Sequence, residues 1–309
     1  MESVRLGRDG PMISRIGFGC AGIAGHDYGP VEWDQAVAAL RAAVDAGVTF
    51  VDVANVYGLG RAESIVGEAI PAGEGVVVAT KVGLCWDDER RTWRDIRPEA
   101  IERSIEGSLR RLRRDVLDVV QVHWPDGNTP VADAVVALAR CREQGKVRSV
   151  GVCNFTGDEV REALGAVDLV SLQLPASMIQ RASFELLGAA RDRHGMTPLC
   201  YNVLGQGLLT GRYAADDRFA GADVRQRSVL FREPMLGEAL ARVEAMRGIA
   251  RERDATIGQV ATRWLLDALP GSCAILGTKS AAQAGENCRV IEPLTRDEFE
   301  SIEAAGAAA

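Results

Sequence analysis

The sequence predicts one α/β domain, a (β/α)8 TIM barrel that spans residues 1–309, with an N-terminal β-hairpin and long loops at its C-terminal face. Three observations predict this fold. Strand-like and helix-like segments alternate along the whole chain. Eight short strand-like runs follow the hairpin, and they are apolar throughout, as is typical of a parallel sheet covered by helices. Eight such units close a barrel of about 250 residues, so a single domain accounts for the length.

The strands are recognised by short apolar runs bounded by polar or glycine-rich residues. Segment 4–14 has Asp9-Gly10-Pro11 at its centre, which predicts the hairpin. The eight barrel strands are expected at 16–18, 48–52, 76–81, 116–123, 147–151, 169–172, 198–203 and 274–276. No linker rich in serine, proline or glycine divides the series.

The intervening segments carry apolar residues three and four positions apart, the spacing of a helix with one buried face. Ile101, Ile105, Leu109 and Leu112 form one such stripe. Helices are expected at 33–46, 62–70, 98–112, 131–144, 158–166, 184–193, 236–253 and 281–289, and from Arg296 onwards. The extra residues follow strands, at 82–97, 124–130 and 204–235, so these loops should lie together at one end of the barrel.

A glycine motif early in the chain suggests a different fold. Gly17-Phe18-Gly19-Cys20-Ala21-Gly22 matches the GxGxxG pattern of dinucleotide-binding folds, which requires a helix to begin at these glycines. Gly25, Gly29 and Pro30 follow, so no helix is expected before about Val31. The barrel is therefore favoured over a doubly wound sheet.

Composition narrows the class of protein. The net charge of −7 argues against nucleic acid or an anionic membrane as a partner. The seven cysteines are odd in number and scattered without CxxC spacing, which favours free thiols over disulfides or a metal site. There is no signal-peptide pattern at the N-terminus and no uncharged window of about 20 residues. We expect a cytoplasmic protein without a metal, a monomer or a small homo-oligomer.

Lysine is rare, and its positions are informative. Only three of the 36 basic residues are lysines, and Lys81 ends an apolar run. Asp52 and His123 end similar runs, and Tyr57 follows Asp52 by five residues. Titratable side chains at the C-terminal ends of successive barrel strands indicate an enzyme site. Taken singly, each has a structural alternative: a turn cap for Asp52, a core histidine for His123 and a loop aromatic for Tyr57.

Six segments, each at the end of an expected strand, together resemble the aldo-keto reductase superfamily. The resemblance runs from Arg5-Leu6-Gly7 to Glu286-Asn287, nearly the whole chain. The matching segments are 52–58, 79–81, 122–126, 151–155, 201–211 and 277–279, with Gln173 and Gln283 as further single matches.

The resemblance implies an enzyme that reduces an aldehyde or ketone to an alcohol with NADPH. It assigns Tyr57 as the proton donor, Lys81 as the group that tunes Tyr57, Asp52 as the anchor of Lys81, and His123 as the residue that orients the substrate oxygen or relays the proton. A phenol with a pKa of about 10 is a weak acid at neutral pH. The neighbouring ammonium stabilises the phenolate and is therefore expected to lower that pKa.

The resemblance also implies how the cofactor binds. Asn154 and Gln173 would hold the carboxamide, and Tyr201 would stack on the nicotinamide. Segment 202–212 would wrap the pyrophosphate. Thr278 and Lys279, before a helix from Ala281, would hold a 2′-phosphate, which favours NADPH over NADH. The full implied set is Cys20, Ala21, Asp52, Cys153, Asn154, Gln173, Tyr201, Asn202, Leu204, Gly205, Gln206, Gly207, Leu208, Arg212, Gly277, Thr278, Lys279, Gln283, Glu286 and Asn287.

The expected substrate pocket comprises His26, Tyr28, Trp86 and Trp124, although the tryptophans could instead pack the loops. The sequence departs from the family in two places that bear on the site. Cys153 replaces a serine, which could loosen the nicotinamide or make turnover sensitive to oxidation, and Ala176 replaces a larger residue and could widen the pocket.

Two alternative functions stay open on the same barrel. One is a non-catalytic NADP(H)-binding subunit that senses redox state, and the other is a sugar or deoxysugar dehydrogenase that works in the oxidative direction. All four residues assigned to catalysis are present, and we call Asp52, Tyr57, Lys81 and His123 the tetrad. Their presence favours an enzyme, but the same groups serve reduction and oxidation equally.

Overall fold

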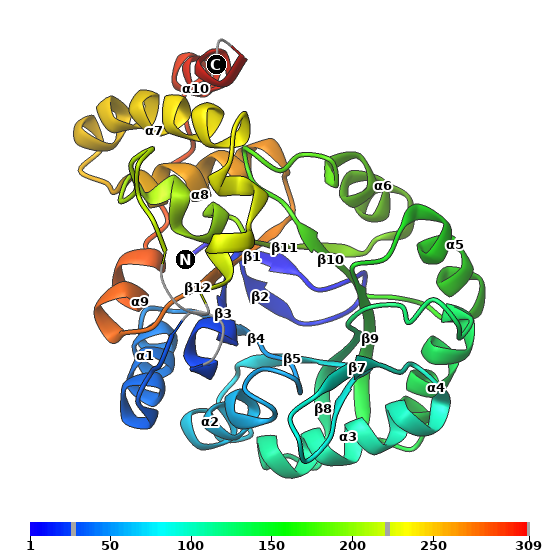
Figure 1. Cartoon of the computed structure of the whole chain (residues 1–309). Helices are drawn as coiled ribbons and strands as arrows, with labels where there is room; N and C mark the ends of the chain where they lie inside the picture. Colours follow the sequence, from blue (N-terminus) through cyan, green and yellow to red (C-terminus); the bar gives the residue numbers. More distant parts are fainter. Residues whose placement is uncertain (26–28, 220–222, 308–309) are drawn as a thin grey trace.

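The computed structural model describes residues 1–25, 29–219 and 223–307. Eight parallel strands close a barrel, as predicted (Figure 1). In the order in which they pair they are β3 (Ile16–Gly19), β4 (Phe50–Asp52), β5 (Val77–Val82), β8 (Leu117–Val122), β9 (Val147–Cys153), β10 (Ser171–Pro175), β11 (Thr197–Tyr201) and β12 (Cys273–Gly277), which pairs with β3 again.

The predicted N-terminal hairpin consists of β1 (Ser3–Arg5) and β2 (Met12–Ser14), and it covers one end of the barrel. Figure 1 shows it lying across that end. Leu6 and Ile13 are completely buried and pack against Phe50, Val119 and Leu199 of the barrel strands. Because apolar side chains fill this end, the opposite end, where the strands finish, is the one left for a functional site.

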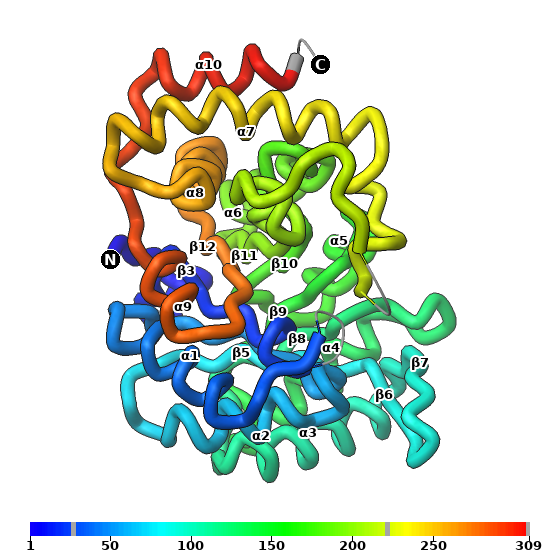
Figure 2. The backbone as a smooth tube through the Cα atoms, turned by 60° about the vertical axis from the view of Figure 1, so that its left-hand side comes forward, coloured from blue at the N-terminus to red at the C-terminus, as the bar shows by residue number. Residues whose placement is uncertain are grey.

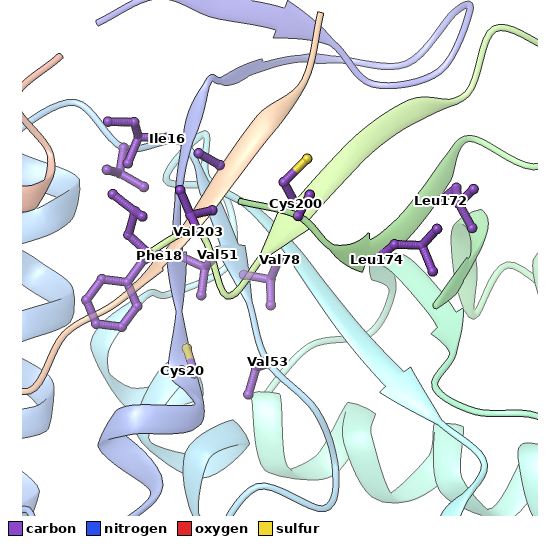
Figure 3. Close-up of a cluster of buried hydrophobic side chains, with 14 of the residues drawn as sticks. Ile16, Phe18, Cys20, Val51, Val53, Val78, Leu172, Leu174, Cys200 and Val203 are labelled. Atoms are coloured by element: carbon purple, nitrogen blue, oxygen red, sulfur yellow. The ribbon is translucent and has the colours of Figure 1, made fainter. Parts of the chain in front are cut away.

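Side chains alternate between the inside and the outside of the barrel along each strand. Val51 and Val78 belong to the large cluster between the strands and the helices, part of which is drawn in Figure 3. Phe50 and Ala79, one position away, belong to the smaller cluster with the hairpin. Asp52 and Lys81 lie two residues beyond Phe50 and Ala79, so the pleat directs both toward the barrel interior.

The outer helices largely follow the predicted boundaries. They are α1 (Trp33–Asp45), α2 (Arg61–Ala69), α3 (Pro98–Leu112), α4 (Val131–Glu143), α5 (Gly157–Ala166), α6 (Phe184–His194), α7 (Met235–Glu252), α9 (Ala281–Asn287) and α10 (Arg296–Ala307). Helix α8 (Ile257–Ala268) was not predicted. Thr256 and Gln259 form a capping box at its N-terminus, a Thr-x-x-Gln signal that was present in the sequence.

The GxGxxG segment differs locally from the prediction. A five-residue 3-10 helix, η1 (Cys20–Ala24), begins before Val31, so the expectation of no helix there was wrong. It ends at Gly25 in the left-handed region (φ 73°), and α1 begins only at Trp33. Since β3 pairs with β4 and β12 inside a closed barrel, the rejection of a doubly wound sheet is confirmed.

The long loops lie at the end of the barrel opposite the N-terminal hairpin (Figure 2). The loop after β5 folds into a second hairpin, β6 (Leu84–Trp86) and β7 (Thr92–Arg94). The loop after β11 contains the 3-10 helices η2 (Gly205–Thr210), η3 (Val224–Arg227) and η4 (Val229–Phe231). Over the described ranges, no helix has the length and apolar character needed to cross a bilayer, and no group of side chains could hold a metal ion.

Candidate active site

A buried ion pair lies at the C-terminal end of the barrel. The Lys81 ammonium donates to Asp52 Oδ1 at 2.7 Å, to Asp52 Oδ2 at 2.8 Å and to the carbonyl of Val53 at 3.0 Å. Both side chains are almost completely buried, with exposed fractions of 1% and 4%. These three acceptors hold the Lys81 ammonium in place.

Tyr57 and His123 complete the group of four predicted residues. The Lys81 Nζ lies 5.2 Å from the centre of the Tyr57 ring. The rings of Tyr57 and His123 meet edge to face, with centroids 5.9 Å apart and an interplanar angle of 81°. The barrel therefore brings together Asp52, Tyr57, Lys81 and His123, which are separated by up to 71 residues in sequence.

The turn that carries Tyr57 is held by local contacts. Asn55 Nδ2 donates to the carbonyl of Leu84 at 2.8 Å, which ties the turn to the β6–β7 hairpin. Gly58 has a φ of 61°, and a Cβ at this position would lie 2.8 Å from the carbonyl oxygen of Ala24. Only glycine fits this approach, so Gly58 determines the path of the chain beside Tyr57.

The electrostatics of the site keep the tetrad in defined protonation states. Burial lowers the pKa of Lys81, but the charges of Asp52 and Tyr57 outweigh it and raise the pKa overall. Burial, followed by the charges of Lys81 and Arg94, holds the pKa of His123 well below its usual range. Lys81 is thus charged and His123 neutral at neutral pH.

Tyr57 departs from the expected electrostatics. Burial raises its pKa well above the ordinary value, and the ammonium of Lys81 opposes this without overcoming it. The expected net lowering of the Tyr57 pKa was therefore wrong. The reason is that Asp52 neutralises much of the Lys81 charge, while the phenol has lost its contact with water.

Asn154, Cys153 and Tyr201 form a hydrogen-bonded group beside the tetrad. Asn154 Nδ2 donates to the carbonyl of His123 at 3.1 Å and to Cys153 Sγ at 3.2 Å, and Tyr201 donates its hydroxyl to Asn154 Oδ1 at 2.8 Å. Gln173 is buried, and its Oε1 has no hydrogen-bond partner among the described residues.

The surroundings of Cys153 and Ala176 bear on the two departures from the family. Burial raises the pKa of the Cys153 thiol to about 12, which leaves almost no reactive thiolate at neutral pH, so sensitivity to oxidation at this residue is not supported. Ala176 is completely buried within the cluster that joins strands to helices. It therefore lies in packed core.

The segment expected at the pyrophosphate forms a tight turn after β11. Asn202 Oδ1 accepts from the backbone N–H of Gln206 at 2.9 Å, and Gly205 and Gly207 have φ values of 55° and 94°. Leu208 is completely buried, whereas Arg212 is exposed. Leu204 is half-buried and accepts, through its carbonyl, from the N–H of Gly207.

The residues expected at the 2′-phosphate follow Gly277 at the end of β12. Thr278 Oγ1 is buried without a partner in the described structure. The N–H of Lys279 donates to Gln283 Oε1 at 2.9 Å, so the Gln283 side chain braces this turn. Helix α9 is only seven residues long, and Ser280 already accepts from its Gln283 N–H, which weakens the expected contribution of a helix terminus.

The remaining expected cofactor residues are more peripheral. Cys20 is completely buried in η1, and Ala21 is half-buried beside it. Glu286 has an exposed side chain, and its carbonyl accepts from Gln259 Nε2 at 2.7 Å, whereas Asn287 is half-buried at the end of α9.

Arg225, which the sequence analysis did not single out, contributes a second cation near Lys279. Burial, followed by the charge of Arg225, lowers the pKa of Lys279, while Asp223 opposes both. Arg225 Nε donates to Asp223 Oδ1 at 2.9 Å. No local pattern in the loop signalled this arrangement, because the two cations are 54 positions apart in sequence.

The expected pocket residues divide into three cases. Trp86 lies 5.5 Å from the Arg111 guanidinium, which also binds Glu63 of α2, so Trp86 packs over the helices. Trp124 follows His123 directly, and its ring lies 4.7 Å from the guanidinium of Arg94. His26 and Tyr28 lie outside the described residues.

Comparison with known proteins identifies the family. The model of the aldo/keto reductase family matches residues 15–307. The chain belongs to the aldo/keto reductase family. This confirms the resemblance drawn from the strand-end segments, and the closed eight-stranded barrel agrees with it.

Three relatives of this aldo-keto reductase have different recorded roles. The NADH-specific methylglyoxal reductase of Escherichia coli is 30% identical over 93% of this chain and 92% of its own length. A probable voltage-gated potassium channel subunit beta of Oryza sativa is 30% identical over 98% of this chain and 96% of its own. The solved structure of a glycerol dehydrogenase from Gluconobacter oxydans is 32% identical, with a TM-score of 0.91, over 99% of this chain and 95% of that one.

Proposed function

We propose that this aldo-keto reductase is a single-domain enzyme that uses NADPH to reduce an aldehyde or ketone to an alcohol, with Tyr57 as the proton donor. The observation that carries the proposal is the buried Lys81 ammonium, held by Asp52 and lying 5.2 Å from the Tyr57 ring. Burying a charged group costs free energy, so stability alone does not explain why a cation is buried beside a phenol here.

The residues around the tetrad fit a nicotinamide cofactor. Gln173 Oε1, Gln206 Oε1 and Thr278 Oγ1 are buried polar atoms without partners among the described residues, and buried polar atoms are normally hydrogen-bonded. Asn154 and Gln173 would hold the carboxamide, Tyr201 would face the ring, and segment 202–212 would follow the pyrophosphate. When bound, the nicotinamide supplies a hydride to the carbonyl carbon.

The tetrad handles the charge that develops on the substrate oxygen. That oxygen becomes an alkoxide, which is far more basic than a phenolate, so the Tyr57 hydroxyl can donate its proton even with a raised pKa. The Lys81 ammonium stabilises the phenolate that results. Neutral His123 offers a ring N–H to the same oxygen and so orients it toward Tyr57.

The preference for NADPH is proposed from the cations near the turn after β12. Lys279 is half-buried, and the positive charge of Arg225 is close enough to contribute to the lowering of its pKa. Two neighbouring cations suit the dianionic 2′-phosphate, which NADH lacks. The Escherichia coli relative is NADH-specific, so kinetics with both cofactors test the preference.

The test of the catalytic proposal is the oxidation of NADPH, followed by absorbance, with a panel of aldehydes and ketones. Wild-type protein should turn over at least one of them. Tyr57→Phe should retain NADPH binding, measured by fluorescence titration, and lose nearly all turnover. Activity close to wild type in Tyr57→Phe would remove Tyr57 from the role of proton donor.

Measurements of NADPH binding and of turnover in both directions separate the two alternatives. The rice relative favours a redox-sensing subunit, for which binding of NADPH without turnover of any carbonyl is expected. The Gluconobacter relative favours oxidation of a polyol or sugar. For that function, NADP⁺ reduction with glycerol or sugars should have a larger kcat/KM than any carbonyl reduction.

A further inference from the structure

The guanidinium of Arg94 lies near His123 and has no acidic partner among the described residues. Its centre is 4.7 Å from the ring centroid of Trp124, the residue that follows His123, and its Nη1 donates to the carbonyl of Pro125 at 3.3 Å. The side chain is exposed. Arg94 also contributes, after burial and Lys81, to the lowered pKa of His123, which places its charge close to the imidazole.

The hairpin places Arg94 between the loops that carry Tyr57 and His123. Arg94 of β7 is directly opposite Leu84 of β6. The carbonyl of Leu84 accepts from Asn55, two residues before Tyr57. On its other side, Arg94 contacts Trp124 and Pro125. The Arg94 guanidinium therefore contacts the segment after His123, while the backbone of its hairpin contacts the segment before Tyr57.

Arg94 has no ion pair among the described residues, in contrast to Arg91 and Arg97 of the same loop. Arg91 pairs with Asp87 and Glu89, and Arg97 pairs with Asp95. Within the described residues, no carboxylate lies within ion-pair distance of Arg94. The nearby Asp126 is already engaged with the backbone N–H groups of Ile96, Asn128 and Thr129.

We propose that Arg94 is a substrate-binding residue that selects aldehydes or ketones bearing a carboxylate. The guanidinium contacts the Trp124 ring and donates one N–H to the Pro125 carbonyl, which leaves its other N–H groups for a carboxylate. Such charge-assisted, bidentate pairs are strong and directional. The substrate carbonyl would then lie at Tyr57 and His123, so this inference rests on the proposed function.

The experiment compares kcat/KM for benzaldehyde with that for 2-, 3- and 4-carboxybenzaldehyde, with NADPH as the reductant. The three isomers move the carboxylate relative to the same aldehyde and so measure the reach to Arg94. We expect at least one isomer to exceed benzaldehyde by roughly tenfold or more, through a lower KM, and Arg94→Gln to abolish that preference. Arg94→Lys should retain part of it, because the charge remains but the planar fork is lost.

Arg91→Gln is the matched control, since it removes one positive charge from the same hairpin but from an arginine that already has partners. It should leave the preference unchanged, and high salt should reduce the preference in wild type. The inference is overturned if no isomer exceeds benzaldehyde, if Arg94→Gln leaves the ratio unchanged, or if it lowers benzaldehyde turnover equally. If the wild type reduces none of the four aldehydes and none of the broader carbonyl panel, the proposed function itself fails.

Discussion

The Lys81 ammonium lies 2.7 and 2.8 Å from the two carboxylate oxygens of Asp52, across adjacent strands at the end of the barrel. This pair is buried and makes a further bond to the Val53 carbonyl. It links folding to the proposed catalysis, because the cation beside Tyr57 is tolerated in the interior only while its partner is present.

Asp52→Asn is expected to lower the free energy of unfolding by about 3–5 kcal/mol, because it leaves Lys81 buried without its counter-charge. Urea denaturation measures this. The double variant Asp52→Asn/Lys81→Met should be more stable than Asp52→Asn alone. If the two single changes are simply additive, the pair is not coupled as the geometry implies.

The lowered pKa of His123 predicts a contribution to acid sensitivity. The unfolded chain binds a proton near pH 6.5, whereas folded His123 resists protonation because it is buried. The stability linked to this residue is therefore present above about pH 6.5 and is lost as pH falls toward the lower folded value, by at most about 1.4 kcal/mol per pH unit. His123→Gln should unfold with a shallower dependence below pH 6.5. An identical pH profile for variant and wild type would contradict the assignment.

Lys279→Met is expected to raise the KM for NADPH by roughly 10- to 100-fold and to change the KM for NADH little, because only NADPH carries the 2′-phosphate. Steady-state kinetics with both cofactors measures the difference. Lys146→Met is the matched control, since Lys146 pairs with Glu106 at the surface. Equal effects of Lys279→Met on both cofactors would defeat the proposal.

Cys153 is expected to resist alkylation in the folded protein. Burial raises its pKa to about 12, so the thiolate is scarce at pH 7–8. Mass spectrometry after limited iodoacetamide treatment should detect modification of half-buried Cys85 before Cys153. Loss of activity that tracks modification of Cys153 in the native state would contradict its inert environment.

Much of this site could be predicted from local patterns. Apolar runs located all eight barrel strands, and the titratable residues at the ends of three of them located Asp52, Lys81 and His123. This worked because parallel strands in a closed barrel all finish at the same face, so position along a strand is also position in space. Helix α8, which was not predicted, begins with a capping box that is visible in the sequence. The hairpin β6–β7 has no comparably clear sequence pattern.

The sequence by itself determined the barrel and the family and indicated the four residues proposed as the tetrad, since each depends on periodicity or on short segments at strand ends. Only the tertiary structure decided the raised pKa of Tyr57, the packing of Trp86 against Arg111, and the positions of Arg225 near Lys279 and of Arg94 beside Trp124. These properties depend on desolvation and on charges brought together from distant parts of the chain. Neither the desolvation of a side chain nor the approach of a distant charge can be read from a short stretch of sequence.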